Sequence, residues 1–385
     1  MRCHVAWTLL TQCGMFVESC SVRGGGFLVG ETARELFACE EIAPEAPMEI
    51  GQATNIDRLD LSSDALRVAR SGMARAVDHA RAREDLGTSL AELGAVQRRI
   101  ADMAVRIYVA ESLVRRTGGL IDALLARLDA EGADAAAHAS DAIDEYAIEL
   151  AIVQVFADET LAAVIQHACE VRARDRIDPD LLDRQRHGGC GDGSGEDGRE
   201  ACRALIPALL MRRAMTEALP VLAFMQGVDA ELTHTSGDAI PDGPLGREIH
   251  AVDQAKRLVA YTTRLFLQRK PAELAYRQQH LETFAEMITD LYAMESAVAR
   301  TAQLIHRHGE EKVKFERDLI TLFLSDASDR LAANARRIFG NDTAGAELEH
   351  HLGVIARLAS YEPLGILDAR ARIAEHVVAG GTALG

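Results

Sequence analysis

Aromatic residues are scarce in this 385-residue sequence. Phe, Trp and Tyr together make up 4% of the chain, although 48% of it is hydrophobic, and Ala and Leu dominate the apolar content. Ala and straight-chain residues lose little conformational freedom in a helix. The composition therefore favours helix over sheet, and the length is sufficient for two or three packed units.

Excess positive charge, paired cysteines and long apolar runs are also lacking. The formal net charge is -17, which repels phosphate backbones and argues against nucleic acid as a partner. The seven cysteines are an odd number and form no C-x-x-C pair, which predicts reduced thiols and a cytoplasmic protein. No apolar run is long enough to span a bilayer.

The beginning of the chain resembles a signal peptide only loosely. Arg2 precedes an apolar stretch, but Thr8, Thr11 and Gln12 interrupt that stretch, and no clean cleavage site follows. We therefore expect no signal peptide.

The histidine pattern predicts no metal site. His306 and His308 are two residues apart on a predicted helix, and His350 and His351 are adjacent. Neither pair shares a helical face, as two metal ligands on one helix would. We expect these histidines to be solvated.

Residues 1–57 differ in character from the rest. Three glycines at 24–26, the stretch TARELFACEEIAPEAP and prolines at 44 and 47 predict short strands and turns. From Asp57 onward, apolar residues recur every three or four positions and predict long helices. Gly309 and Gly340 are expected to end two of these helices. The three clearest stripes are Leu93, Val96, Ile100, Met103 and Ile107; then Ile148, Ile152 and Val155; then Phe284, Met287, Leu291, Met294 and Val298.

Two glycine-rich polar stretches, 175–199 and 233–246, predict solvated linkers. No internal repeat is apparent from the sequence.

Five segments in the same order resemble the C-terminal half of the very-long-chain acyl-CoA dehydrogenase family. They are LGTSLAELGAVQRRIADMAVRIYVAESLVRRTGGLID from Leu86, AIDEYAIELAIVQVFADETL from Ala142, LIPALLMRRAMTEALPVL from Leu205, LYAMESAVARTAQLIHRHGEEK from Leu291 and YEPLGILDARARIAEHVVAGG from Tyr361. TARELFACEEIAPEAP resembles the last strands of the family's middle β domain.

The resemblance implies an all-α fold with a short β-rich N-terminal remnant. Residues 1–57 would be that remnant, 58–218 the acyl-CoA dehydrogenase C-terminal four-helix domain, and 219–385 a second helical bundle. The family's N-terminal helical domain and most of its β domain have no counterpart in the sequence. Family members pair through the four-helix domain, so a homodimer or a hetero-oligomer with a related dehydrogenase is expected.

The resemblance also implies candidate site residues. Family members remove the α-proton of an acyl-CoA with a glutamate, and hydride from the β-carbon passes to FAD. Counting back from Leu205 without gaps places that catalytic base at Glu196. Arg83 matches the arginine that contacts the FAD diphosphate, and Arg58 matches an arginine near the acyl-CoA.

Departures from the family pattern argue against retention of FAD by this chain alone. The glycine turn that approaches the flavin falls at residues 172–176, which read RARDR, and side chains there would block the approach. Asp85 follows Arg83 where the family has glutamine, and an aspartate repels a diphosphate at close range.

Simpler interpretations compete at each site. Asp197 follows Glu196 where the family has glycine, so Glu196 can be read as one acidic residue of a glycine-rich loop. Arg58 and Arg83 can be read as exposed helix arginines.

Residues 257–270, RLVAYTTRLFLQRK, predict a basic amphipathic helix. Such a helix could lie on an anionic membrane surface. Packing into the protein core with snorkelling cations explains the same residues at lower cost, and we favour it.

Three functional hypotheses remain open. The chain could catalyse FAD-dependent α,β-dehydrogenation with Glu196 as base, if a partner supplied the domains it lacks. It could be a non-catalytic helical partner or pseudoenzyme of an intact dehydrogenase. It could also be a decayed fragment.

Overall fold

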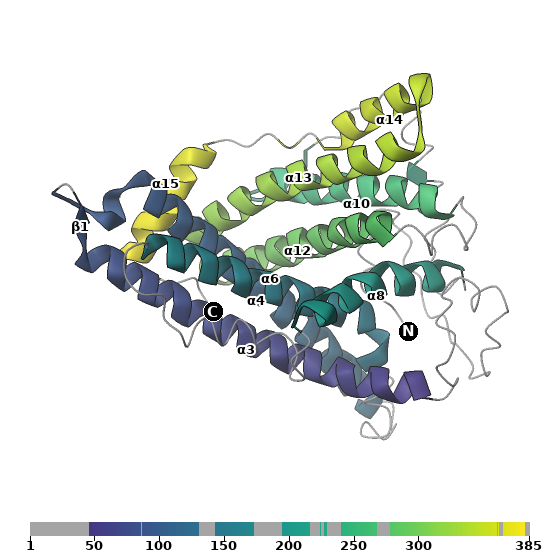
Figure 1. Ribbon diagram of the computed structural model, residues 1–385, viewed down its shortest axis with the longest axis horizontal. Helices are drawn as coiled ribbons and strands as arrows, with labels where there is room; N and C mark the ends of the chain where they lie inside the picture. The colour runs from purple at the N-terminus through teal and green to yellow at the C-terminus, as the bar shows by residue number, and fades with distance from the viewer. Residues whose placement is uncertain are drawn as a thin grey trace.

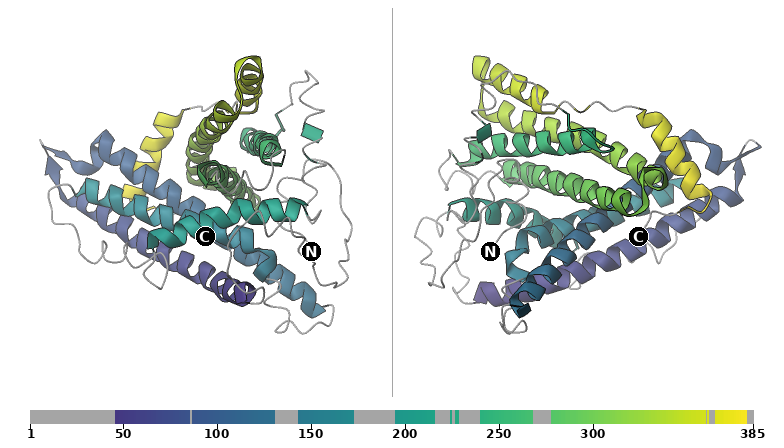
Figure 2. Two further views of the ribbon diagram at one scale, coloured as in Figure 1. Left: turned by 45° about the vertical axis from the view of Figure 1, so that its right-hand side comes forward. Right: turned by 180° about the vertical axis from the view of Figure 1, so that it is seen from behind.

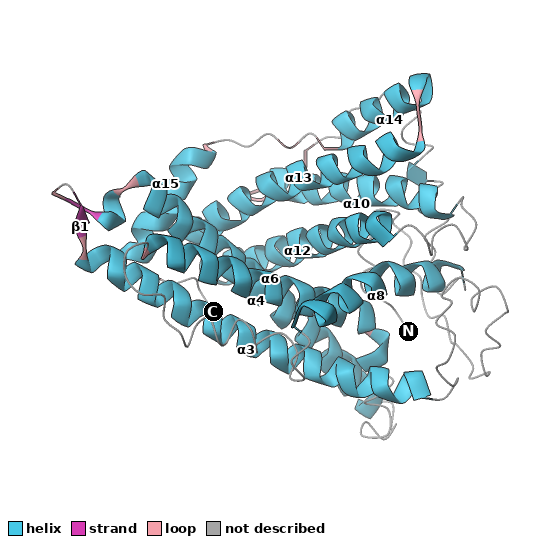
Figure 3. Ribbon diagram, viewed as in Figure 1, coloured by secondary structure: helices cyan, strands magenta, loops and turns pink. Residues whose placement is uncertain are grey.

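The computed structural model describes residues 46–85, 87–130, 143–172, 195–215, 240–267, 278–359 and 365–381, together with 224, 227, 228 and 361. The described chain is almost entirely helical (Figure 3). Its helices are α3 (Ala46–Ala82), α4 (Gly94–Ala130), α6 (Ala147–Val171), α8 (Gly195–Met215), α10 (Gly246–Leu267), α12 (Gln278–His308), α13 (Lys314–Asp342), α14 (Gly345–Leu358) and α15 (Ile366–Val378), with the 3-10 turns η2 (Leu90–Glu92) and η3 (Glu310–Val313).

β-structure within the described residues is limited to one small hairpin. Strands β1 (Glu84–Asp85) and β2 (Thr88–Ser89) pair antiparallel, with Glu84 opposite Ser89. The expected β-rich remnant is wrong for residues 46–57, which form the start of α3. Pro47 lies in the first turn of that helix, where a missing N–H costs nothing, so the proline signals a helix start. Residues 1–45 lie outside the described residues.

A first bundle contains α3, α4, α6 and α8. Asn55 of α3 donates to Asp144, just before α6, and Gly72 of α3 lies against Val164 of α6, so these two helices are parallel. α8 is antiparallel to α6, because Arg203 bonds Glu159 whereas Arg213, further along α8, donates to the carbonyl of Glu145.

A second bundle contains α10, α12, α13 and α15, with α14 at its outer edge (Figures 1 and 2). α15 runs back along α4 to the end of the first bundle that carries β1 (Figure 1). There Arg81, at the end of α3, donates to the carbonyl of Val378.

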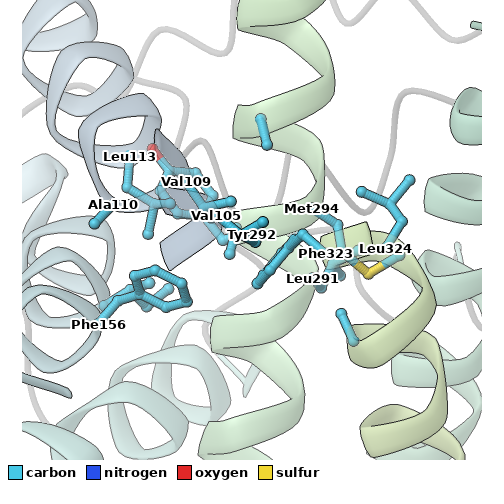
Figure 4. Packing of buried hydrophobic residues seen from close by; sticks show 14 of the residues in the cluster. Val105, Val109, Ala110, Leu113, Phe156, Leu291, Tyr292, Met294, Phe323 and Leu324 are labelled. Atoms are coloured by element: carbon cyan, nitrogen blue, oxygen red, sulfur yellow. The ribbon is translucent and has the colours of Figure 1, made fainter. Parts of the chain in front are cut away.

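The predicted apolar stripes form the core. Every stripe residue except the half-buried Leu93 is buried, which confirms the stripes on α4, α6 and α12. Figure 4 shows the two bundles meeting in one apolar layer, with Val105 from α4, Phe156 from α6, Tyr292 from α12 and Phe323 from α13. The Phe156 and Phe323 rings lie edge to face, with centroids 6.0 Å apart.

The second bundle repeats the first, so the expectation of no internal repeat is wrong. Residues 108–121 of α4 read YVAESLVRRTGGLI, and residues 292–305 of α12 read YAMESAVARTAQLI, with eight of fourteen positions identical. Both helices begin at equivalent positions, Gly94 and Gln278, with the same offset of 184 residues that relates Tyr108 to Tyr292.

The repeated residues bind each other reciprocally across the α4–α12 crossing. Tyr108 Oη lies 2.8 Å from Thr301 Oγ1, and Tyr292 Oη lies 2.9 Å from Thr117 Oγ1. Tyr108 of the first bundle contacts Thr301 of the second, and their equivalents, Tyr292 and Thr117, make the same contact in the opposite direction. Such a reciprocal contact indicates a two-fold axis. The two bundles are therefore related by a local two-fold axis through this crossing.

The relation extends to other helices, here at an offset of 167 residues. The ion pair between Glu159 of α6 and Arg203 of α8 recurs between Asp326 of α13 and Arg370 of α15.

Helices α12 and α15 of the same chain cover α4. Dimer formation stays a prediction.

The two glycine caps have different outcomes. Gly309 follows α12 with φ +81°, a left-handed conformation that favours glycine, so this cap is confirmed. Gly340 lies inside α13, so its expected role as a cap is wrong. Ile338 and Phe339, both buried, fix the last turns of α13, and a glycine within a helix costs only about 1 kcal/mol.

The basic amphipathic helix is α10. Leu258 and Phe266 are 1% and 3% exposed, so its apolar face packs in the core. Within the described residues, no helix is long and apolar enough to cross a membrane. The unit boundaries at 57/58 and 218/219 stay predictions.

Candidate functional site

Arg58 is buried rather than exposed. It lies on α3 with 7% of its surface accessible and donates to the side chain of Asn55, which in turn donates to Asp144 at 3.1 Å. These bonds link α3 to the residues before α6. The expectation of an exposed helix arginine is therefore wrong for Arg58, and its role near an acyl-CoA stays a prediction.

Arg83 and Glu196 lie toward one end of the first bundle. Arg83 is exposed and directly follows α3. Glu196 lies in the first turn of α8 rather than in a loop, which corrects the loop interpretation. Because α8 runs antiparallel to α6, its beginning lies toward the end of α6, the same end at which α3 finishes.

The structure does not bring all three predicted residues together. Arg58 lies at the beginning of the bundle, roughly 36 Å along α3 from Ala82, the residue before Arg83, at 1.5 Å per residue. The turn expected at residues 172–176 begins at Arg172, the C-cap of α6, and its other residues lie outside the described residues.

A separate cleft lies where the two bundles meet. It encloses about 340 Å³ and is lined by α4, α6, α8, α12 and α13. We call it the interbundle cleft. Its lining contains repeat equivalents, which places it on the local two-fold axis: Asp102 and Glu286, Val105 and Thr289, Arg106 and Asp290, Val155 and Leu322, Phe156 and Phe323, Glu159 and Asp326.

Charged groups of the interbundle cleft connect helices. Arg330 donates to both carboxylate oxygens of Asp290, at 3.0 and 2.7 Å. Arg370 of α15 lies 3.5 Å from Asp326 and 3.6 Å from Asp102 of α4, so it joins the two bundles. Arg203 bonds Glu159.

Two of these carboxyl groups bind protons more readily than usual. Partial burial raises the pKa of Glu286, and the nearby carboxylates of Glu159 and Asp290 raise it further, although Asn334 donates to it at 3.0 Å. Partial burial also raises the pKa of Asp326, against the lowering effect of Arg370 and Arg330. The cleft is thus an interface of paired charges that can take up protons.

Sequence reasoning missed this cleft, yet a signal for it exists. Glu159 precedes Arg203 by 44 residues, and Asp326 precedes Arg370 by 44 residues. An alignment of the two halves would have shown an acid–arginine pair at the same spacing in each.

One histidine differs from expectation. His351 is half-buried, and its Nδ1 lies 2.6 Å from the hydroxyl of Tyr261. Burial lowers the pKa of His351. Among the described residues, no group of three or more His, Cys, Asp or Glu side chains could hold a metal ion.

The fit of FAD to the described residues is poor. Arg83 is the one described residue matched to the diphosphate, and strand β1 places Glu84 and Asp85 directly after it. Two acidic residues beside one arginine disfavour a diphosphate.

Comparison with known families gives two matches with the same description, "Acyl-CoA dehydrogenase, C-terminal domain". One covers residues 50–175 and the other residues 254–357. The first range falls on α3, α4 and α6, and the second on most of α10, on α12 and α13, and on nearly all of α14. The two matches thus fall on the two bundles that the local axis relates.

Individual relatives agree with these matches. The chain is 25% identical over 349 residues to a "Probable acyl-CoA dehydrogenase" of Bacillus subtilis (strain 168), which covers 88% of this chain and 59% of the relative. It is 38% identical over 89 residues to cyclohex-1-ene-1-carbonyl-CoA dehydrogenase of Syntrophus aciditrophicus (strain SB), covering 23% of this chain and 22% of that protein.

A solved structure is also similar. The acyl-CoA dehydrogenase of Bacillus anthracis complexed with FAD superimposes with a TM-score of 0.79 at 26% identity, covering 86% of this chain and 56% of that one. The chain therefore spans less than two thirds of the length of these two Bacillus proteins.

Proposed function

Because the chain belongs to the acyl-CoA dehydrogenase family and carries its C-terminal helical domains, we propose that it is a helical scaffold. By itself, this scaffold neither holds FAD nor dehydrogenates acyl-CoA. The single observation that carries the proposal is the pair of acidic residues, Glu84 and Asp85, that directly follows Arg83, the arginine matched to the FAD diphosphate.

The family reaction needs parts that these residues do not provide. FAD-dependent α,β-dehydrogenation requires a base close to the substrate in a dry pocket. Arg58 is engaged with Asn55, far along α3 from Arg83. The acidic residues after Arg83 disfavour the diphosphate. These features support a structural role in a larger assembly, with acyl-CoA and FAD bound by other segments or by a related dehydrogenase.

An alternative is half of a split enzyme of the very-long-chain type, in which Glu196 is the base. The helical position of Glu196 favours this alternative over a loop carboxylate, because the first turn of a helix holds its backbone in one conformation.

Substitution of Glu196 separates the two proposals. The Bacillus subtilis relative contains a part that does not align with this chain. This part would be co-purified with the chain, and turnover of a long-chain acyl-CoA by the complex would be measured. A scaffold predicts equal turnover with wild-type chain and Glu196→Gln. Gln keeps the shape but cannot accept the α-proton, so a base at Glu196 predicts collapse of turnover.

The neighbouring acid provides the matched control. Asp197→Asn removes one charge from the same helical turn and should leave turnover unchanged under both proposals. A loss with Glu196→Gln that Asp197→Asn does not reproduce would contradict the scaffold.

A further inference from the structure

A basic groove lies on the other side of the α4–α12 crossing from the interbundle cleft. The cleft is lined by the N-terminal halves of α4 and α12, whereas the groove is lined by their C-terminal halves. It encloses about 460 Å³, which is within the range of small-molecule sites. Its repeat-equivalent lining residues are Ser112 and Ser296, Arg116 and Arg300, Gly119 and Gln303, and Leu120 and Leu304.

The groove is strongly cationic in a chain of net charge -17. Its lining residues include Arg115, Arg116, Arg300 and Arg307 and no carboxylate. Glu295 and Glu111 pair with Arg116 and Arg300, so the positive potential that attracts anions comes mainly from Arg115 and Arg307.

Two of these arginines already have a structural task. Arg116 donates to Glu295 at 2.5 Å, and Arg300 lies 3.3 Å from Glu111. Arg116 also lies over the Tyr292 ring at 5.2 Å, and Arg300 over Tyr108 at 4.3 Å. This reciprocal pair holds the two bundles together.

The other two arginines break the symmetry. Arg115 is equivalent to Ala299, and Arg307 to Ala123, so the bundle interface is built without a cation at those positions. Both side chains are exposed, and neither has an ion pair within the described part of the chain. An exposed guanidinium whose N–H donors bind no carboxylate is suited to bidentate binding of phosphate oxygens.

We propose that this groove binds a soluble organic phosphate carrying at least two negative charges, with Arg115 and Arg307 as its ligands. The ligand would lie on the local two-fold axis, beside the ion-paired Arg116 and Arg300. The site does not rest on the proposed scaffold function.

Isothermal titration with inorganic pyrophosphate at low salt tests the proposal. We expect one site per chain, with sulfate at matched ionic strength binding more weakly. Arg115→Ala and Arg307→Ala should each weaken binding roughly tenfold, because each removes a charge-assisted hydrogen-bond donor pair. Both residues are exposed, so the variants should melt at the wild-type temperature.

The control is an Arg67→Ala, Arg336→Ala variant, which removes two exposed arginines that lie on α3 and α13. It should bind pyrophosphate like the wild type. Equal loss in the control, or wild-type binding by the Arg115→Ala, Arg307→Ala variant, would overturn the site. Binding to phosphatidic acid vesicles without binding of pyrophosphate would overturn it as well.

Discussion

At the residue scale, two buried tyrosines join the bundles. Tyr108 and Tyr292 are 2% and 1% exposed, and each reaches a threonine on the opposite helix. Burial raises the pKa of both phenols, that of Tyr108 to about 12. The neutral phenol is therefore part of the interface.

We predict that Tyr108→Phe and Tyr292→Phe each lower the free energy of unfolding by about 1 kcal/mol. Phe fills the same volume, so the loss is mainly one buried hydrogen bond. Thr301 still donates to the carbonyl of Ala297, which limits the cost. Denaturant titration at neutral pH measures both variants, and the local two-fold axis predicts similar values for the two.

Tyr108 also makes the free energy of unfolding depend on pH. A folded pKa above the unfolded value of 10 leaves stability unaffected below pH 10 and lowers it as the pH rises from 10 to about 12. The slope from one group is at most about 1.4 kcal/mol per pH unit. Tyr108→Phe should flatten this part of the profile, and an unchanged alkaline slope would contradict the assignment.

At the element scale, two glutamates each bind cations from two helices. Glu111 of α4 bonds Arg70 of α3 and Arg300 of α12. Its equivalent Glu295 of α12 lies 2.9 Å from Lys256 of α10 and 2.5 Å from Arg116 of α4. Each glutamate therefore ties one bundle internally and joins it to the other.

We predict that Glu111→Gln and Glu295→Gln each destabilise the fold by about 3 kcal/mol. Each substitution removes the carboxylate that a mostly buried arginine binds, Arg300 at Glu111 and Arg116 at Glu295, and such a loss is costly. Glu311→Gln is the matched control, because Glu311 is 84% exposed and pairs with the exposed Lys314. It should cost less than about 1 kcal/mol. Equal shifts in melting temperature for all three variants would contradict the role of Glu111 and Glu295.

The long helices were predictable, while their ends and relations were less so. Stripes on α4 and α12 repeat over several turns, so the local sequence alone specified them. Gly340 and Pro47 misled because one residue type serves both inside and at the edge of helices. The repeat was not predicted because the sequence identity between the two bundles is concentrated in fourteen residues each of α4 and α12.

At the scale of the whole molecule, one apolar core runs through both bundles. The fold class followed from family resemblance and periodicity, since both depend on residues close in sequence. The interbundle cleft did not, because it needs Asp102, Glu159 and Asp326 from three helices far apart in the chain. Burial of Arg58 likewise depends on how α3 packs against the start of α6, which no local pattern encodes.

The visible spectrum of the purified chain tests the central claim most directly. If the chain is a scaffold that does not hold flavin, the protein purified alone is colourless and shows no flavin absorbance band, even after incubation with FAD and gel filtration. The acidic residues after Arg83 give the physical reason. A yellow protein that retains one FAD per chain would contradict the account.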